Sequence, residues 1–392
     1  MVLLLFATQA CTDIFLPGLP QIAAEFHSSI DVASRTVSVY NIVQAIVVLV
    51  IGVVSDVRGR RPTMLLCFGL HIAATVVIAL CGSMGVMIAM RAVQALGSAA
   101  VYIVLRMIIK DTLDKKAQIH ATGLLVIGLV LSPILAPVVG SWIVHWSNWR
   151  NCFWLLALID LPLFIWAYIV VGETNLRRDE MKASFSWSAH AGSYASVLRD
   201  PYFGGMALIV GAGFAAFYAF ISISSFMFIQ QFHLHETTYG YVFIALALSY
   251  LAGNRCMSIL NARALAPQKI IGLGLLVSVA GAACVLVSPV FAPAAVVALV
   301  IAFGTCLLRL ATALIIPPAQ VEVTNHFPQH SAHALGLLTC IQYCFAAIGT
   351  VVVSSLWFAP SVNFMISTVV FVALSALGLL MLGRRGRVAP GA

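Results

Sequence analysis

The feature that most constrains this chain is a series of apolar runs, each about 20 residues long and able to cross a ~30 Å hydrocarbon layer. We count twelve such runs along the chain. Each is predicted to be a helix, because only helices and closed barrels satisfy every backbone polar group in lipid, and the runs lack the alternation of barrel strands. The predicted spans are residues 1–18, 36–55, 63–82, 85–109, 118–143, 150–172, 203–228, 238–259, 268–288, 292–315, 332–355 and 361–383.

The composition excludes a soluble globular protein. Of the 392 residues, 62% are hydrophobic and 9% are charged, whereas soluble domains carry roughly 25% charged residues. The sequence therefore predicts an all-α membrane protein with the lipid bilayer as its main surroundings.

The basic residues predict the orientation of the spans. With twelve spans and both termini in the cytoplasm, the opposite side receives only Arg35 and Arg150, whereas many more Lys and Arg residues fall on the cytoplasmic side. This is the bias that the positive-inside rule describes. The net charge of +8 then follows from topology, so no nucleic-acid partner is predicted.

The start of the chain allows two interpretations. The segment "MVLLLFATQA" has the length of a signal-peptide core, but no basic region precedes it. Read as a span, the stretch up to Leu16 covers only ~24 Å of helix. We therefore expect a first span that is short at its cytoplasmic end, with Met1 either a late start or the first residue of a shortened chain.

The longest polar stretch, residues 173–201, separates six spans from the next six. We predict an N-terminal six-helix bundle at 1–172, a cytoplasmic central loop at 173–202 and a C-terminal six-helix bundle at 203–392. Such halving is typical of transporters built from structural repeats, whose substrate site lies near the membrane midplane.

The turn "GVVSDVRGRRP" at 52–62 follows the second predicted span. Gly52 permits close helix approach, Asp56 supplies a carboxylate, and Gly59 allows a tight turn. Arg60 and Arg61 supply cations. An ordinary basic turn is the alternative interpretation of this segment.

A second polar group lies inside the fourth predicted span, "RAVQALGSAA" at 91–100. Arg91 should find an anion or a backbone partner, because a cation inside a membrane must be paired. Gln94 and Gly97 share a helix face with Arg91. A purely structural bracket would also explain the arginine.

The fifth predicted span contains "GLVLSPILAPVVGSW" at 128–142. Pro133 and Pro137 should bend the helix, and Gly140 allows close packing. A simple kink is the alternative explanation of both prolines.

These three segments resemble motifs of the major facilitator superfamily. The first resembles its signature, although Val57 stands where a basic residue is usual, and the second resembles its fourth-helix motif. The third partly resembles its antiporter motif, with Ala136 and Ser141 departing from the family's Gly-Pro and Gly-Gly pairs. The resemblance implies two pseudo-symmetric six-helix bundles that work by alternating access.

The segment "TDIFLPGLPQIAAEF" at 12–26 resembles the end of the first helix in the Bcr/CflA drug-resistance branch, as "NWR" at 148–150 does before the sixth. That resemblance implies a monomeric drug:proton antiporter of the bacterial inner membrane, exporting bicyclomycin-, chloramphenicol- or sulfonamide-like drugs. A proton-linked or facilitated carrier of one metabolite is the alternative. A receptor or embedded enzyme is a third class, but no catalytic triad supports it.

Asp13 and Arg91 are the predicted proton-coupling residues. A carboxylate within an apolar run can bind and release a proton when a cation lies nearby, and an intramembrane acid is costly unless it is used. The structural alternative places Asp13 at the membrane interface or on backbone donors near Pro17.

Further polar residues lie inside predicted spans. We predict that Asp160 pairs with His71 in a structural contact. Arg309 is the counterpart of Arg91 in the second half, and Glu322 is expected to pair with its neighbours and gate that side.

The predicted site residues form a substrate-binding set and a conformational-switch set. The substrate-binding set adds to the polar residues above two aromatic residues of the seventh span, because aromatic side chains suit flat amphipathic drugs. It consists of Asp13, Arg91, Gln94, Phe217, Tyr218 and Arg309. The predicted conformational switch consists of Gly52, Asp56, Gly59, Arg60, Arg61, Pro133, Pro137 and Gly140.

Neither a metal nor a cofactor is predicted. His233 and His235 lie in one predicted loop, and His326, His330 and His333 lie in another, with no acid or Cys cluster to complete a ligand set. The nine cysteines form no CxxC pair and are expected to be buried small hydrophobes. No phosphate-binding Gly-x-x-x-x-Gly-Lys motif is present, so a gradient or passive transport is expected rather than ATP hydrolysis.

Overall fold

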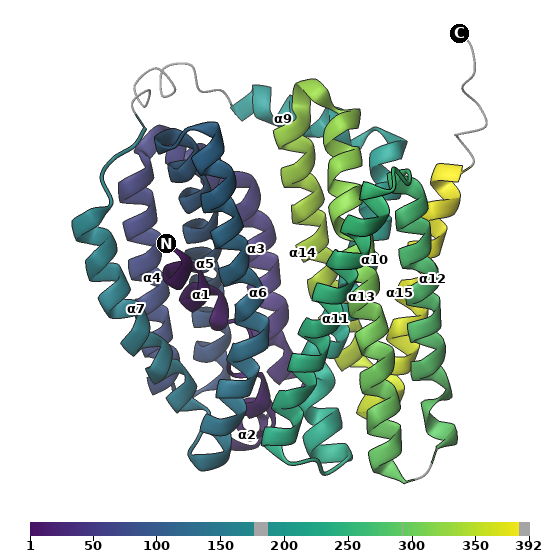
Figure 1. Cartoon of the computed structure of the whole chain (residues 1–392). Helices are drawn as coiled ribbons and strands as arrows, with labels where there is room; N and C mark the ends of the chain where they lie inside the picture. The colour runs from purple at the N-terminus through teal and green to yellow at the C-terminus, as the bar shows by residue number, and fades with distance from the viewer. Residues whose placement is uncertain (176–186, 292, 384–392) are drawn as a thin grey trace. The chain divides into compact units, whose positions relative to one another are not determined.

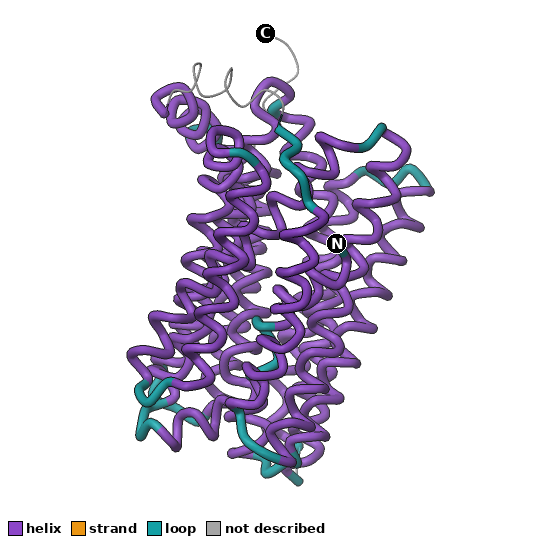
Figure 2. The backbone as a smooth tube through the Cα atoms, turned by 90° about the vertical axis from the view of Figure 1, so that its left-hand side faces the viewer, coloured by secondary structure: helices purple, strands orange, loops and turns teal. Residues whose placement is uncertain are grey.

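The computed structural model describes residues 1–175, 187–291 and 293–383. Helices make up most of these residues, no strand occurs among them, and loops connect the helices (Figure 2). The prediction of an all-α protein is confirmed.

The described chain divides into two compact units. The N-terminal unit contains the described residues up to 175 together with His235–Phe243, and the C-terminal unit contains Trp187–Leu234 and the described residues from Ile244 onward. The segment His235–Phe243 thus packs with the N-terminal unit although the residues on either side of it belong to the other.

The N-terminal unit is a bundle in which α4 packs between α5 and α7, and α1 packs against α6 (Figure 1). Its core contains apolar side chains of α1, α3, α4 and α5, such as Leu5, Ile51, Phe68 and Val104. The helices are α1 (Val2–Ala10), α2 (Leu19–Glu25), α3 (Ile30–Arg58), α4 (Arg60–Leu80), α5 (Met84–Thr112), α6 (Lys115–Trp146) and α7 (Arg150–Val170), with a 3₁₀ turn η1 (Leu16–Gly18).

The C-terminal unit is built around α10, which packs against α13, α14 and α15 (Figure 1). A second pair, α12 and α13, lies alongside. The helices are α9 (Trp187–Leu198), α10 (Pro201–Ser225), α11 (Glu236–Ala262, of which this unit contains the part from Ile244 onward), α12 (Pro267–Val287), α13 (Ala294–His326), α14 (Ser331–Ser355) and α15 (Pro360–Gly383). A short π-helix, η2 (Phe226–Gln231), and two 3₁₀ turns, η3 (Ser288–Val290) and η4 (Pro328–His330), connect them.

Several helices begin at a residue whose side chain accepts a hydrogen bond from a backbone N–H of the first turn. These N-terminal groups have no partner inside the helix, so a capping oxygen stabilises the end. Ser29, Ser83, Asp114 and Asp200 cap α3, α5, α6 and α10 in this way.

Ten helices among the described residues are long and apolar enough to cross a membrane. In α7 the most apolar window has a mean hydropathy of 2.1, yet only 28% of it is buried inside the protein. Leu158 and Ile169 of this helix are 71% and 74% exposed. An apolar surface of this extent is suited to lipid rather than water.

The first predicted span, residues 1–18, is not one helix. Helix α1 ends at Ala10, residues 11–15 form turns, and η1 and α2 follow. Pro17 and Pro20 lie in the first turns of η1 and α2, where a proline's missing N–H costs nothing. Asp13 therefore lies in the turns between α1 and η1, outside any helix.

The predicted central loop, 173–202, contains helix α9 among its described residues. Pro133 and Pro137 both lie inside helix α6, where the predicted bend stays a prediction. One other expectation differs from the structure. Two of the cysteines expected to be buried, Cys256 and Cys344, are exposed.

Candidate functional site

Arg91 of α5 is fully buried and donates hydrogen bonds to three oxygens. Its Nη1 lies 2.9 Å from the Cys11 carbonyl oxygen and 2.6 Å from Gln94 Oε1. Its Nε lies 3.3 Å from the Thr36 carbonyl oxygen. These three acceptors are neutral, so backbone and amide dipoles contributed by three segments of the unit solvate the positive charge.

Two aromatic rings complete the surroundings of this guanidinium. Arg91 Cζ lies 4.4 Å from the ring centre of Phe15 and 4.3 Å from that of Tyr40. Tyr40 Oη in turn contacts Cys11 Sγ and Ser98 Oγ. The ring faces attract a desolvated cation electrostatically, so they help to hold a charge that water cannot reach.

Gln94 connects Arg91 to a buried histidine and acid. The side-chain Nε2 of Gln94 donates to Thr75 Oγ1 over 2.7 Å. The backbone carbonyl oxygen of Gln94 lies 3.1 Å from His71 Nδ1. His71 Nε2 lies 3.3 Å from Asp160 Oδ2, and both side chains are fully buried. The predicted pairing of Asp160 with His71 is confirmed.

Asp13 lies in the turn that follows α1 and is half-buried. Two residues before it, Cys11 presents the carbonyl that accepts from Arg91, and Asp13 acts on the Arg91 charge through a Coulombic interaction. The role of these two charged residues as a proton-coupling site stays a prediction.

Helix α6 packs closely against the turn that contains Asp13. A Cβ atom added to Gly140 would collide with the carbonyl oxygen of Ile14, the residue after Asp13. Nearer the start of the helix, a Cβ at Gly128 would lie 3.0 Å from the Val2 carbonyl oxygen. Because small residues let backbones approach, Gly140 sets how close α6 comes to the acid. Pro137, one turn earlier, is buried, and Pro133 is half-buried.

The turn between α3 and α4 is held by Glu173, which follows α7. Gly59 has φ +103°, a conformation that favours glycine, and a Cβ there would collide with the Glu173 carboxylate. The backbone N–H groups of Arg60 and Arg61 donate to Glu173 over 2.9 and 3.3 Å. Arg61 also donates to the Tyr168 carbonyl oxygen over 2.9 Å. The glycine is therefore needed for both the turn and the carboxylate.

Arg60 joins three segments at the same end of the bundle. It lies 2.5 Å from Asp56 and 3.0 Å from Asp111, which comes from the last turn of α5, and it donates to Ser55 Oγ over 2.8 Å. Gly52 lies one turn before Asp56, and a Cβ atom added to it would lie 3.1 Å from Met107 Cε of α5. Asp56 and Arg60, two of the predicted switch residues, thus form a charged cluster with Asp111 that links α3, α4 and α5.

Arg309 of α13 forms a second cation site, in the C-terminal unit. Its Cζ lies 4.0 Å from the ring centre of Phe217 and 4.4 Å from that of Tyr250. Tyr218 packs edge-on against Phe217, with ring centres 5.9 Å apart. Phe217 and Tyr218 are both buried, and Arg309 is half-buried. The structure therefore brings together the three substrate-binding residues predicted in this half.

Glu322, near the end of α13, accepts hydrogen bonds from Tyr202 Oη at 2.8 Å and Gln268 Nε2 at 2.6 Å. His326, which the sequence analysis placed in a predicted loop, is the exposed last residue of α13, lies 3.0 Å from Asp200 and stacks on Tyr202. These residues, except Glu322, line a cavity of about 640 Å³ in the C-terminal unit. The expectation that Glu322 pairs with its neighbours is confirmed.

A comparison with known families decides the wider assignment. The profile described as Major Facilitator Superfamily matches residues 1–350. The chain belongs to the Major Facilitator Superfamily. The matched residues include the Gly52–Arg61 turn and the Arg91 segment, which resembled this superfamily in sequence.

Among relatives of this Major Facilitator Superfamily chain, the multidrug transporter MdfA of Yersinia pestis bv. Antiqua (strain Angola) is 26% identical over 271 residues, which are 69% of the chain and 65% of that relative. The multidrug resistance protein MdtL of Escherichia coli O45:K1 (strain S88 / ExPEC) is 32% identical over 163 residues, 42% of each. The chain thus spans slightly less than two thirds of the length of the MdfA proteins. The transporter names support the prediction that the chain is not an enzyme.

Two solved structures resemble the chain over 97% of both lengths. A mutant form of the nucleoside transporter NupG has a TM-score of 0.75 at 10% identity. The human organic anion transporter MFSD10 (TETRAN) has a TM-score of 0.60 at 17% identity. At these identities the likeness establishes the shared fold.

Sequence reasoning missed several residues of these sites. Glu173 and Asp111 complete the Gly59 turn, and Tyr40 and Tyr250 complete the two arginine sites. The signal for Glu173 and Asp111 was weak, because each is a single acid at the end of an apolar helix. Tyr40 and Tyr250 carried no such signal, because an aromatic residue in an apolar run predicts packing and not a contact with a cation.

A glutamine at Glu173 tests whether the carboxylate holds the turn. Partial burial opposes the charged form, but the backbone N–H donors around Glu173 outweigh it and lower the pKa of the carboxyl from its ordinary value of 4.5. A lowered pKa means that the carboxylate stabilises the fold above its unfolded pKa, and that this contribution is lost as the pH falls through the folded value. For Glu173→Gln we expect the Arg60 and Arg61 amides to be less protected from hydrogen exchange at pH 7, relative to the intrinsic rate at that pH. In the wild type we expect the same loss of protection only in acid.

The matched control is Glu322→Gln, which neutralises an acid hydrogen-bonded to side chains in the other unit. Its Arg60 and Arg61 amides should exchange as in the wild type. Unchanged exchange in Glu173→Gln at pH 7 would show that the turn holds without the carboxylate.

Proposed function

We propose that this chain exports small amphipathic drugs across the bacterial inner membrane in exchange for protons, as a member of the Bcr/CflA branch. Asp13 carries the proton and, with Arg91, forms the coupling site. The relatives named as multidrug transporters support drug export in general. The observation that carries the proposal is the fully buried Arg91, which is held by neutral acceptors, one of them two residues before the half-buried Asp13.

The charges of this site explain how a proton and a drug can compete. A cation inside an apolar bundle is stabilised when a nearby carboxylate is ionised, and it loses that partner when the carboxylate is protonated. A drug that binds close to Asp13 also changes how strongly the ionised carboxylate is favoured over the protonated one. Proton binding and drug binding are therefore linked through one group, as coupled exchange requires.

A repeated cation site supports two pseudo-symmetric six-helix bundles. In each unit an arginine lies over one phenylalanine ring and one tyrosine ring, contributed by the fourth, first and second predicted spans of that half. The two sets are Arg91, Phe15 and Tyr40, and Arg309, Phe217 and Tyr250. Within the proposal, the monomeric chain has twelve spans with both termini in the cytoplasm, as the basic residues of the sequence predict.

The second cation site suits the proposed class of substrate. Phe217 and Tyr218 offer flat apolar surfaces beside the Arg309 guanidinium, which can donate to a carbonyl or an anionic group of a drug. Asp13, Arg91 and Gln94 would contribute the polar contacts of the other half. The Gly52–Arg61 turn and the Pro133–Gly140 segment of α6 would act as the switch of alternating access.

The test is drug-induced proton movement in sealed vesicles that carry the full chain, with an imposed pH gradient and chloramphenicol as the first drug. We expect the wild type to exchange drug for protons and Asp13→Asn to bind the drug without moving protons. The matched control is Asp31→Asn, which neutralises a partly exposed acid paired with Arg35 and should exchange normally.

Two outcomes would overturn the proposal. Normal exchange by Asp13→Asn would make the acid structural, and the coupling site would be sought first at Glu322. Uptake of a single nutrient, with no response to unrelated drugs, would identify a metabolite carrier of the same superfamily instead.

A further inference from the structure

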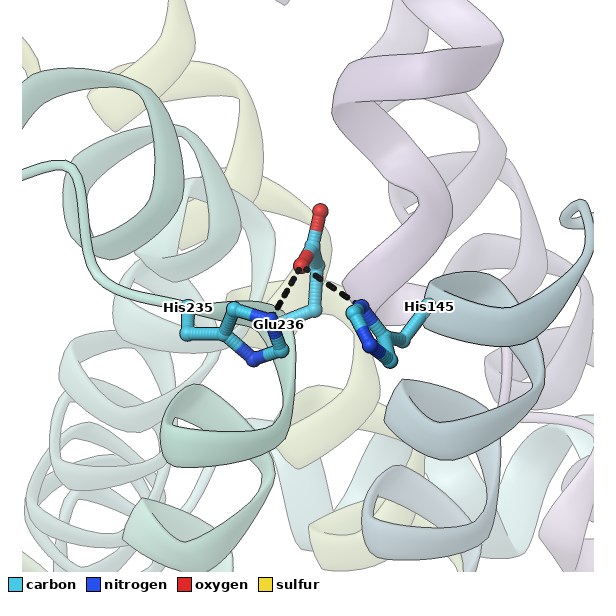
Figure 3. A group of neighbouring side chains, drawn as sticks. All are labelled: His145, His235 and Glu236. Carbon is cyan, nitrogen blue, oxygen red and sulfur yellow. Dashed lines mark ion pairs between the residues drawn. The ribbon is translucent and has the colours of Figure 1, made fainter.

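Three side chains of the N-terminal unit that could hold a metal ion, those of His145, His235 and Glu236, lie close together (Figure 3). His145 is the penultimate residue of α6, His235 precedes α11, and Glu236 is the first residue of α11. His145 Nδ1 lies 3.6 Å and His235 Nε2 4.0 Å from Glu236 Oε2, and one ligand atom of each residue lies within 4.8 Å of the others. Both histidines are exposed, so an ion can reach the group from solvent.

The distances are close to those of a bound transition metal. Zn²⁺ binds histidine nitrogen at about 2.0–2.1 Å and carboxylate oxygen at about 2.0–2.2 Å, which places tetrahedral ligand atoms about 3.4 Å apart. The two separations from Glu236 exceed this by about 0.2 and 0.6 Å, and no two of the three ligand atoms lie more than 4.8 Å apart. Partly exposed side chains close such a gap by small rotations, without movement of the backbone.

His235 is already oriented by a neighbour. Its Nδ1 lies 2.8 Å from Thr237 Oγ1, which leaves Nε2 directed at Glu236. Metal-binding histidines usually have their second nitrogen fixed in this way. His233, in a left-handed conformation with φ 53°, turns the chain just before the site.

The helices that carry the ligands are packed closely. A Cβ added to Gly240 would collide with Ser141 Oγ and lie 3.3 Å from the Val138 Cα atom of α6. The start of α11 therefore lies directly on the last turns of α6. This contact brings His145 to the other two residues, and it keeps the ligands in place before any ion binds.

We propose that His145, His235 and Glu236 bind a divalent transition metal ion, with Zn²⁺ the best match. Two imidazoles and one carboxylate are ligands that zinc prefers, and three protein ligands leave one position open to water. Hard cations such as Mg²⁺ prefer oxygen ligands and are not expected to bind. A bound ion would join the end of α6 to the start of α11.

The experiment measures Zn²⁺ binding to the purified full chain, free of any histidine tag and stripped with a chelator, by competition with a chromophoric chelator. We expect one tight site in the wild type, weakened by more than about tenfold in His145→Ala, His235→Ala and Glu236→Gln, since loss of even a supporting residue costs about 10–100-fold. Excess Mg²⁺ should not displace the zinc. Glu236→Gln keeps the shape of the side chain and reports on the site should a histidine variant fail to fold.

The matched control is His233→Asn, which removes an exposed neighbouring imidazole and keeps a residue tolerant of positive φ. It should bind zinc as the wild type does. Equal zinc affinity in all of the proteins would place the ion elsewhere, for example on the exposed Cys256 or Cys344, and displacement by Mg²⁺ would indicate nonspecific attraction to an acid. Either result would overturn the proposed site.

Discussion

Replacing Arg91 with Met should abolish drug–proton exchange and lower the free energy of unfolding by about 2–4 kcal/mol. The loss leaves Gln94 Oε1 and the Cys11 carbonyl oxygen without the donor they share, at about 1–3 kcal/mol for each buried unsatisfied group. Removal of a desolvated cation offsets part of that cost. The measurements are thermal unfolding of the purified protein in detergent and proton release from vesicles.

Arg91→Lys should not restore exchange. An ammonium group keeps the charge, but it cannot direct three planar donors at separated acceptors or stack on the rings of Phe15 and Tyr40. The matched control is Arg106→Met, because Arg106 is an exposed arginine of the same helix with a tyrosine beside it. Its stability should change by less than about 0.5 kcal/mol. Wild-type stability and exchange in Arg91→Met would show that the buried cation is dispensable.

Replacing Gly140 with Ala should be nearly as damaging. The added Cβ would collide with the Ile14 carbonyl oxygen and lie 3.2 Å from its Cα atom. Because both contacts are with backbone, no rotamer change relieves them, and the Asp13 turn must move away from α6. We expect a cost of about 3 kcal/mol, at the upper end of the usual range for overpacking, with loss of exchange.

Gly85→Ala is the matched control for that substitution. Gly85 lies in the first turn of α5, and a Cβ there would meet nothing within 4 Å. Alanine should leave exchange unchanged and stabilise the helix by about 0.5–1 kcal/mol, since glycine has the greater backbone freedom when unfolded. If Gly140→Ala unfolds at the wild-type temperature, α6 and the Asp13 turn are not packed as closely as described.

The polar residues inside apolar runs were the part of the site that the sequence predicted well. Asp160 and His71 stood out because a polar residue inside an apolar run must find a partner, and each was the partner available to the other at similar depth. Arg309 was singled out as the counterpart of Arg91 in the second half and Phe217 as an aromatic residue of the seventh predicted span, and their roles in binding stay predictions. The prediction of one continuous first helix was wrong, because local hydropathy does not register that Pro17 and Pro20 begin new helical segments.

Contacts between distant segments could not be predicted. Nothing near Glu173 in the sequence indicates that it accepts hydrogen bonds from the turn after α3, and nothing near His145 indicates His235. Such contacts depend on how helices pack, which is set by many small side chains and glycines whose individual signals in a sequence are weak. The close approaches at Gly140 and Gly240 illustrate this.

The sequence by itself determined most of the long apolar helices, the resemblance to the superfamily and the residues that must be paired. It did so because the bilayer imposes strict and local requirements on hydropathy, backbone hydrogen bonding and charge. Only the tertiary structure decided which partners those residues have: the neutral acceptors and rings around Arg91, the carboxylate at the Gly59 turn and the histidine pair beside Glu236. The reason is physical, since partner choice depends on distances between chain segments, and those distances exist only once the helices are packed.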